Sequence, residues 1–279
     1  MPAFDTVSIL IGEFLDRLEL TYRRIYGKTR NDHVNTLRTC GMMALEIIAN
    51  SDALYHDVEH SIMVSLVGQD ILRGRQLRDG DVSPSDWVNF IVSLLCHDIG
   101  YVRGICPGDD GDDAVIDGEG KTVAIPPGAT DAFLTPYHVE RGKMFVRWRF
   151  REHPVVDPGV VAANIEHTRF PVPAATDSRE TADYPGLVRA ADLIGQLADP
   201  DYRRKLPALF YEFEETGANR RIGYNSPQDL HDSYPEFYWK MVSRHVGVGL
   251  DYLRVTRQGR HWQASLYSHI FCEEHPQAL

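Results

Sequence analysis

The sequence predicts an all-α fold, organised as a single domain over residues 1–279. Apolar residues recur at helical spacing along most of the chain, with charged residues on the opposite faces. Strand patterns do not alternate with helical ones, and neither an internal repeat nor a low-complexity linker divides the chain. Only residues 104–130, which are rich in Gly, Pro and Asp, interrupt the helical pattern. A chain of 279 residues is long enough to bury one large hydrophobic core.

Three helices are expected in the N-terminal part of the chain. Residues 5–27 carry apolar side chains at every third or fourth position, which is the spacing of one helix face. A second helix is expected from near Arg30 to Ile48, and a third from near Asp57 to Ile71, on the same grounds.

The fourth helix has a recognisable start. Ser83 suits the N-cap, Pro84 suits the first helical position, and Asp86 favours the first turn through the helix dipole. The residues VNFIVSLLC follow Trp87 and are apolar nearly all round, so we expect a central, buried helix. Gly100 is the expected terminator.

The segment 104–130 is expected to leave the helical body as a lid or rim. Its AVIDG and KTVAI stretches predict a short β-hairpin. Its acidic run lacks the ligand spacing of a calcium loop, so we expect a solvated acidic loop. Further helices are expected over 137–150, 158–167, 184–198, 201–215, from Pro227, from Pro235 and over 262–271.

The composition limits the classes of binding partner and the cellular compartment that we expect. Lys and Arg total 29 against 40 Asp and Glu, a net charge of −11, which argues against nucleic-acid polymers and anionic membranes as partners. The four cysteines are widely separated, which favours a reducing compartment. No apolar stretch approaches the roughly 20 residues that span a bilayer, and the acidic N-terminus differs from a signal peptide. We therefore expect a cytoplasmic protein.

Two segments combine imidazoles with carboxylates. In YHDVEH, His56 and His60 are four residues apart, which would place both on one helix face, one turn apart. In CHDIG, His97 and Asp98 follow a buried apolar run. A buried carboxylate is costly unless it is paired or binds a metal, so Asp98 points to metal binding more strongly than to a helix end.

Three further residues complete a candidate ligand set. His138 begins a predicted helix, His167 follows Asn164-Ile165-Glu166, and Asp192 is a single carboxylate among small and apolar residues. Imidazole with carboxylate suits Fe, Mn, Zn or Ni, and the lack of thiolates disfavours a structural zinc site. The set exceeds what one four-coordinate ion needs, and a bridging Asp98 would make a two-ion centre. The candidate ligands are His60, His97, Asp98, His138, His167 and Asp192.

In the order H…HD…H…H…D on a helical chain, these residues resemble the HD-domain metal-dependent phosphohydrolase superfamily. YHDVEH, CHDIG and AADLI are similar to cyclic-nucleotide phosphodiesterases, whereas HDIG, His138 with Gly142, and EHTRFP resemble the HD-GYP branch. The resemblance covers about residues 50–200 and leaves 201–279 as a helical C-terminal extension. Tyr101 stands where HD-GYP proteins have lysine, RFP stands where they have GYP, and the second histidine of the phosphodiesterases is missing. The chain matches neither branch clearly.

The resemblance implies an HD-domain helical bundle and a role for each residue. His56 would protonate the leaving oxygen, although a carboxylate at that position helps to bind a third metal in some HD-GYP proteins. The first ion would be held by His60, His97, Asp98 and Asp192, and the second by Asp98, His138 and His167.

The activity implied is hydrolysis of a small, nucleotide-like phosphoester, as in a phosphodiesterase, by a metal-bridging hydroxide. Arg103 and Arg169 are close in sequence to ligands and are candidates for substrate binding, although both also suit an exposed surface. Two alternatives stay open: a di-iron oxygenase with the same fold, and a regulatory module with a vestigial metal site. An aromatic group in 201–279 is expected in the core, although some of its members could line the substrate pocket by stacking. Its members are Phe210, Tyr211, Phe213, Phe237, Tyr238, Trp239 and Tyr252. The histidines expected to be structural or exposed are His33, His153, His231, His245, His261, His269 and His275.

Overall fold

The computed structural model describes residues 5–28, 30–173 and 182–275. In this part of the chain almost all regular structure is helical, which confirms the all-α class, and one two-stranded sheet is present. Buried apolar side chains from the first helix to the last form one contiguous cluster. No helix among the described residues has both the length and the apolar composition needed to cross a membrane.

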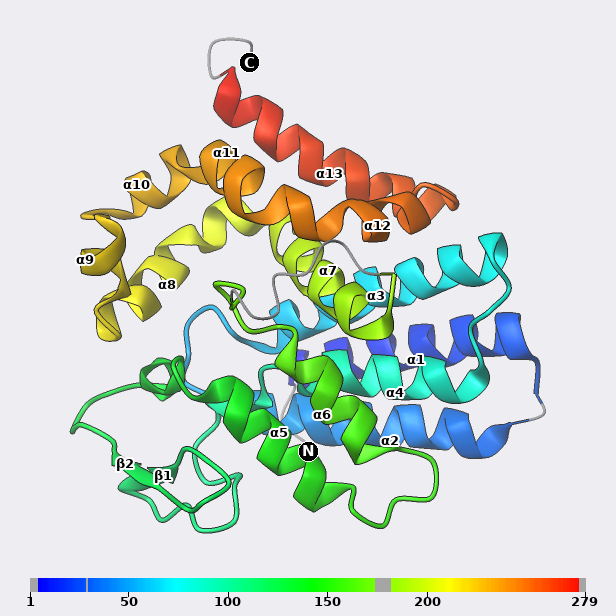
Figure 1. The fold of residues 1–279 in the computed structure, drawn as a ribbon, viewed down its shortest axis with the longest axis horizontal. Coiled ribbons are helices and arrows are strands. Elements are labelled where there is room, and N and C mark those ends of the chain that lie inside the picture. Colours follow the sequence, from blue (N-terminus) through cyan, green and yellow to red (C-terminus); the bar gives the residue numbers. More distant parts are fainter. Residues whose placement is uncertain (1–4, 29, 174–181, 276–279) are drawn as a thin grey trace.

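The first four helices form the central layer of Figure 1, and α4 lies inside it. Every residue of α4 from Trp87 to Cys96 is buried, as predicted, and α4 packs against α2, α3, α6 and α7. Its predicted start is confirmed, because Ser83 and Asp86 exchange the reciprocal hydrogen bonds of a capping box. The bounds are α1 Thr6–Tyr26, α2 Asn31–Ile48, α3 Val58–Arg78 and α4 Pro84–Cys96.

Gly100 does not terminate α4, contrary to our expectation. The helix ends at Cys96, and Gly100 lies within the short 3₁₀ helix η1 (Ile99–Tyr101). A Cβ atom at Gly100 would stand 1.9 Å from the carbonyl oxygen of His138. Glycine is therefore required by the close approach of α5 to η1.

The segment after η1 contains the predicted hairpin. Strands β1 (Asp113–Val115) and β2 (Thr122–Ala124) pair antiparallel, with Asp113 opposite Ala124. Figure 1 shows this hairpin at the edge of the helical body. The prediction of a solvated acidic loop is only partly right, since Asp109 is buried against Arg141 of α5 (His138–Arg149) while Asp110 and Asp112 are exposed.

Helices α6 and α7 pack on α4, and α12 and α13 pack on α3. Helix α7 packs along α3, and α12 packs on α7 and α3, with α13 beyond α12 in Figure 1.

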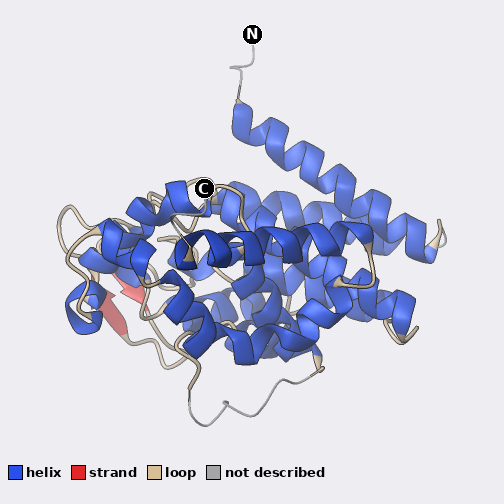
Figure 2. Ribbon diagram, turned by 90° about the horizontal axis from the view of Figure 1, so that it is seen from above, coloured by secondary structure: helices blue, strands red, loops and turns tan. Residues whose placement is uncertain are grey.

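The expected aromatic core is wrong for Tyr211 and Trp239, which are more than half exposed. Figure 2 shows the first turns of α1 extending beyond the other helices. The further elements are η2 Asp131–Leu134, α6 Pro158–Glu166, α7 Tyr184–Leu197, α8 Tyr202–Glu215, α9 Ala218–Ile222, α10 Pro227–Asp232, α11 Tyr234–Phe237, the π-helical turn η4 Tyr238–Val242, α12 Ser243–Leu253 and α13 Arg257–Glu274.

Candidate metal centre

Three helices bring two histidines and two aspartates to one point. One ligand atom each from His60, His97 and Asp192 lies within 4.8 Å of the other two. Asp98 Oδ2 lies 3.2 Å from His60 Nε2 and 3.0 Å from His97 Nε2. Asp192 Oδ1 lies 3.8 Å and 3.4 Å from the same two nitrogens. All four residues are among those the sequence proposed for a first metal ion.

Local structure sets the position of each side chain. Asp57 is the N-cap of α3 and its carboxylate accepts a hydrogen bond of 2.9 Å from the backbone N–H of His60, which fixes that residue in the first turn. His97 follows the last residue of α4, and its Nδ1 donates to the carbonyl of Leu94 at 2.7 Å. Asp192 lies in the middle of α7, where this helix packs on α3.

In its neutral form, His97 turns one hydrogen-bond acceptor, its Nε2 atom, toward the acceptor oxygens of Asp98 and Asp192. Because Nδ1 carries the proton given to Leu94, Nε2 of the neutral ring presents a lone pair to Asp98 and Asp192. His97 Nε2 and Asp98 Oδ2 are both buried without a hydrogen-bond partner. Buried acceptors in this arrangement are costly unless a cation lies between them. The donor set therefore fits a divalent cation.

The charges lead to the same conclusion. Two neutral imidazoles and two carboxylates leave two negative charges in a buried cluster. Although burial opposes the charged ring, Asp98 and Asp192 raise the pKa of His97 well above its usual value. Burial would raise the pKa of Asp98, but His97 and His60 outweigh burial and hold this pKa well below its usual value. Without a metal, the cluster would retain a proton in place of the missing cation.

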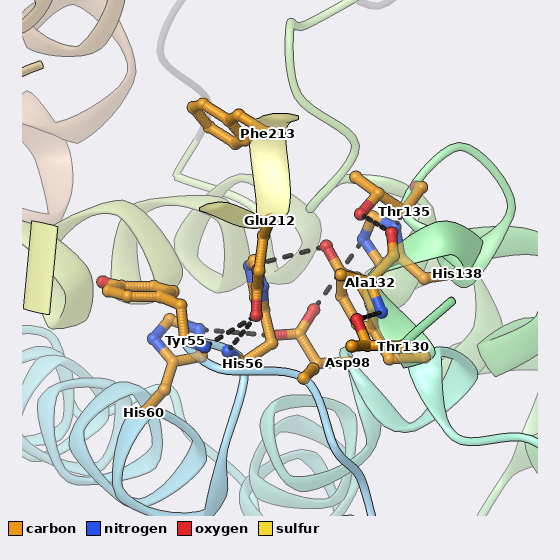
Figure 3. Close-up of polar contacts among 12 residues, drawn as sticks. Tyr55, His56, His60, Asp98, Thr130, Ala132, Thr135, His138, Glu212 and Phe213 are labelled. Atoms are coloured by element: carbon orange, nitrogen blue, oxygen red, sulfur yellow. Dashed lines mark hydrogen bonds and ion pairs between the residues drawn. The ribbon is translucent and has the colours of Figure 1, made fainter. Parts of the chain in front are cut away.

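His56 lies beside this cluster but not on the helix we expected. Helix α3 begins at Val58, because Asp57 serves as its N-cap, so His56 precedes the helix and the two histidines are not one helical turn apart. The rings of His56 and His60 are nevertheless near, with centroids 5.5 Å apart. The bend before the cap turns the His56 ring toward Glu212 of α8 (Figure 3).

Glu212 is a buried carboxylate that holds His56 by three hydrogen bonds. His56 Nδ1 donates to Oε2 at 2.6 Å, and the backbone N–H groups of Tyr55 and His56 donate to Oε1 at 2.6 and 3.2 Å. Burial lowers the pKa of His56, but the Glu212 carboxylate outweighs it and raises the pKa to about 9. The ring is therefore a proton donor at neutral pH in the metal-free protein.

Tyr101 lies between His56 and His138 in a stack of three rings. Its centroid is 4.4 Å from that of each histidine, with interplanar angles of 17° and 19°. The Tyr101 hydroxyl oxygen lies 3.5 Å from His56 Nε2. His138 is the first residue of α5, as predicted; its Nδ1 donates to the carbonyl of Thr135 at 2.6 Å, and its Nε2 lies 3.8 Å from Asp98 Oδ1. Figure 3 shows His138 and His56 on opposite sides of Asp98.

His167 is held apart from these residues. It caps the C-terminus of α6, and Arg189 of α7 donates to its carbonyl at 2.9 Å and approaches its Nδ1 at 3.4 Å. Across the described part of the chain, no hydrogen bond or ion pair joins His167 to Asp98 or His138.

The two arginines proposed to bind substrate are engaged with carboxylates. Arg103 donates to Asp131 at 2.5 Å and to Asp52 at 2.7 Å. Arg169 donates to Glu140 at 2.6 Å and to Glu166 at 2.8 Å. Each would have to leave an ion pair in order to bind a phosphate.

Sequence reasoning missed Glu212, Arg189 and the stacking role of Tyr101. Glu212 is distant in sequence from His56 and lies in a helix with several other acidic residues, so no local pattern distinguishes it. Arg189 could have been found, because it precedes Asp192 by three residues and so shares a helix face with a proposed ligand. Tyr101 was noticed only as a departure from two known motifs.

Comparisons with known proteins identify a family for this chain. A search of curated proteins and a search of solved structures returned no match. The model of the Npun_R2479-like family matches residues 4–276, which is nearly the whole chain. The protein therefore belongs to the Npun_R2479-like family.

Proposed function

We propose that this protein is a metal-dependent phosphoester hydrolase with an HD-type helical fold. The observation that carries the proposal is the cluster of His60, His97, Asp98 and Asp192, in which buried lone pairs face one another. This donor set suits Fe, Mn, Zn or Ni. When bound, such an ion lowers the pKa of a water molecule and neutralises charge on phosphoryl oxygens.

His56 supplies the proton that the leaving oxygen needs. Glu212 accepts a hydrogen bond from Nδ1–H of His56, which fixes the ring and leaves Nε2 as the nitrogen that gives and regains a proton. The Tyr101 ring stacks on one face of the imidazole and restricts its rotation. A protonated ring held next to the metal ligands suits cleavage of a P–O ester bond, in which the departing alkoxide must be protonated.

The substrate class proposed is a small, nucleotide-like phosphoester, with a phosphodiester as the first choice. The chain's net charge of −11 disfavours a polymeric polyanion, whereas a single phosphoester can be bound by a metal ion in a buried site. The cysteines are unpaired, which supports a reducing compartment such as the cytoplasm.

The metal content of ligand variants tests the centre. We expect purified protein to contain a transition metal by elemental analysis, and we expect His97→Ala and Asp98→Ala to lose it, because each removes a buried ligand. His261→Ala, on the exposed side of α13, is the matched histidine control and should retain the metal. Full metal content in Asp98→Ala would show that the assignment is wrong.

Turnover tests the reaction and the role of His56. The metal-loaded protein should hydrolyse at least one member of a panel of cyclic nucleotides, mononucleotides, dinucleotides and generic phosphodiesters. His56→Ala should retain metal while turnover falls about 10²- to 10⁴-fold, the usual contribution of a general acid. Loss of metal in that variant would make His56 a ligand. Oxygen consumption with a mixed-valent iron signal would favour a di-iron oxygenase, and retained metal without any turnover would favour a regulatory module.

A further inference from the structure

We infer that the centre holds one divalent ion and not two, and that the guanidinium of Arg189 replaces the second ion beside His167. The inference rests on the proposed metal centre and concerns its stoichiometry. A second ion would need Asp98, His138 and His167 together. Only two of these three residues approach each other, and the third is bonded to a cation.

The two ring nitrogens of His167 are in the wrong roles for a metal ligand. A guanidinium has donors and no acceptor, so the Nδ1 atom that faces Arg189 must carry a lone pair. In a neutral ring the proton is then on Nε2, which cannot bind a metal. His97 and His138 have the opposite arrangement, because their Nδ1 atoms donate to backbone carbonyls, which leaves the lone pair on Nε2 when the ring is neutral. Carbonyl partners of that kind are typical of metal-binding histidines.

The position of Arg189 is fixed by the helix that supplies Asp192. The two residues are three apart on α7, so the helix directs a carboxylate to the first ion and a guanidinium to His167 from adjacent turns. Arg189 is buried and its Nε donates to the His167 carbonyl at 2.9 Å. Its guanidinium thereby takes up the lone pair of His167 Nδ1 that a metal ion would need.

The ligands that remain for a second ion are too few. His138 Nε2 lies 3.8 Å from Asp98 Oδ1, the carboxylate oxygen opposite to the one that faces His60 and His97. Stacking on Tyr101 fixes the His138 ring in that position. Two protein ligands are fewer than the three or four with which proteins retain a transition metal.

The test is the number of ions bound per chain. The full-length protein is stripped with a chelator, reloaded with Mn²⁺ and measured by elemental analysis and native mass spectrometry. We expect one ion per chain at saturation in the unaltered protein, in His138→Ala and in His167→Ala, and none in His97→Ala. Two ions in the unaltered protein, with one lost in His167→Ala, would overturn the inference.

The role of Arg189 is tested by asking whether its replacement allows a second ion to bind. Arg189→Met removes the charge and the donor at Nδ1 while preserving bulk, so we expect a second Mn²⁺ to bind at high ion concentration. Arg169→Met is the matched control, since this arginine is also close to His167 in sequence but pairs with Glu140 and Glu166. A count that stays at one in Arg189→Met, or rises equally in Arg169→Met, would remove the role given to Arg189.

The ion count and the hydrolysis assay together distinguish this inference from the proposed function. One ion without phosphoester hydrolysis would keep the stoichiometry and reject the activity. Two ions with hydrolysis would reject the stoichiometry and keep the activity. A complete absence of bound metal in the unaltered protein would reject both.

Discussion

At the scale of single residues, the site depends on Glu212, a carboxylate that contacts His56 and not the proposed metal ligands. Glu212 is buried and its oxygens accept three hydrogen bonds from Tyr55 and His56. Replacing it affects two properties together, the orientation of the His56 ring and its protonation. These properties can be separated, because an amide of the same shape preserves some hydrogen bonds but removes the charge.

Glu212→Gln should lower the pKa of His56 from about 9 in metal-free protein. The reason is that burial lowers this pKa and the carboxylate that offsets burial is gone. The direction of the pH dependence of stability follows from the raised pKa of His56. A pKa raised on folding stabilises the protein below pH 6.5, and this contribution disappears as the pH rises through about 9. Glu212→Gln should reduce that loss of stability between pH 6.5 and 9.

Histidine NMR titration of metal-stripped protein measures the pKa, and denaturant unfolding at several pH values measures the stability. Glu46→Gln, an exposed glutamate on α2, is the matched control and should leave both unchanged. An unchanged His56 pKa in Glu212→Gln would mean that Glu212 does not control the protonation of the ring.

At the scale of elements, the approach of α5 to η1 places His138 beside Asp98. Two features permit it. Gly100 lets the two backbones come together, because any Cβ atom there would overlap the His138 carbonyl. Arg141, fully buried, donates to the carbonyls of Gly100, Val102 and Val115 and makes two bonds to Asp109. The hairpin segment is thus attached to the helix that carries a site residue.

Asp109→Ala should destabilise the fold by about 3–5 kcal/mol, because it leaves the buried Arg141 charge without its only carboxylate partner among the described residues. Denaturant unfolding measures this free energy. Asp112→Ala, an exposed aspartate of the same acidic run, should change stability by no more than about 0.5 kcal/mol. Equal effects of the two variants would contradict a special role for Asp109.

At the scale of the whole molecule, the proposed ligands come from α3, α4 and α7, which form the middle of one contiguous core. An ion bound there links α7 to α3 and to the end of α4, which both lie far from α7 in the sequence. Binding should therefore stabilise the folded chain as a unit, because the unfolded chain does not hold these ligands together.

Removal of the metal should lower the thermal midpoint, and its return should restore it. At a free ion concentration 100 times Kd, the stabilisation is about 2.7 kcal/mol. Differential scanning calorimetry of stripped and reloaded protein measures it. His97→Ala should show no metal-dependent shift and His261→Ala the full shift. A shift of equal size in His97→Ala would place the bound ion elsewhere in the molecule.

Several helices were predictable because local chemistry defines their ends. The capping box of Ser83 and Asp86 and the N1 prolines of α6 and α10 are local signals, and the structure confirms each of these starts. The pairing of His56 and His60 on one helix was wrong because Asp57, which lies between them, is the N-cap of α3. Spacing alone could not show which residue begins the helix.

The sequence by itself determined the helical class and the hairpin, since periodicity is a local property of the chain. It also proposed six candidate metal ligands, four of which the structure brings together. Only the tertiary structure decided which partners those residues meet. Glu212 reaches His56 across more than 150 positions, and Arg189 rather than a ligand faces His167. Such contacts depend on how helices pack, and packing brings together side chains whose sequence separation carries no signal.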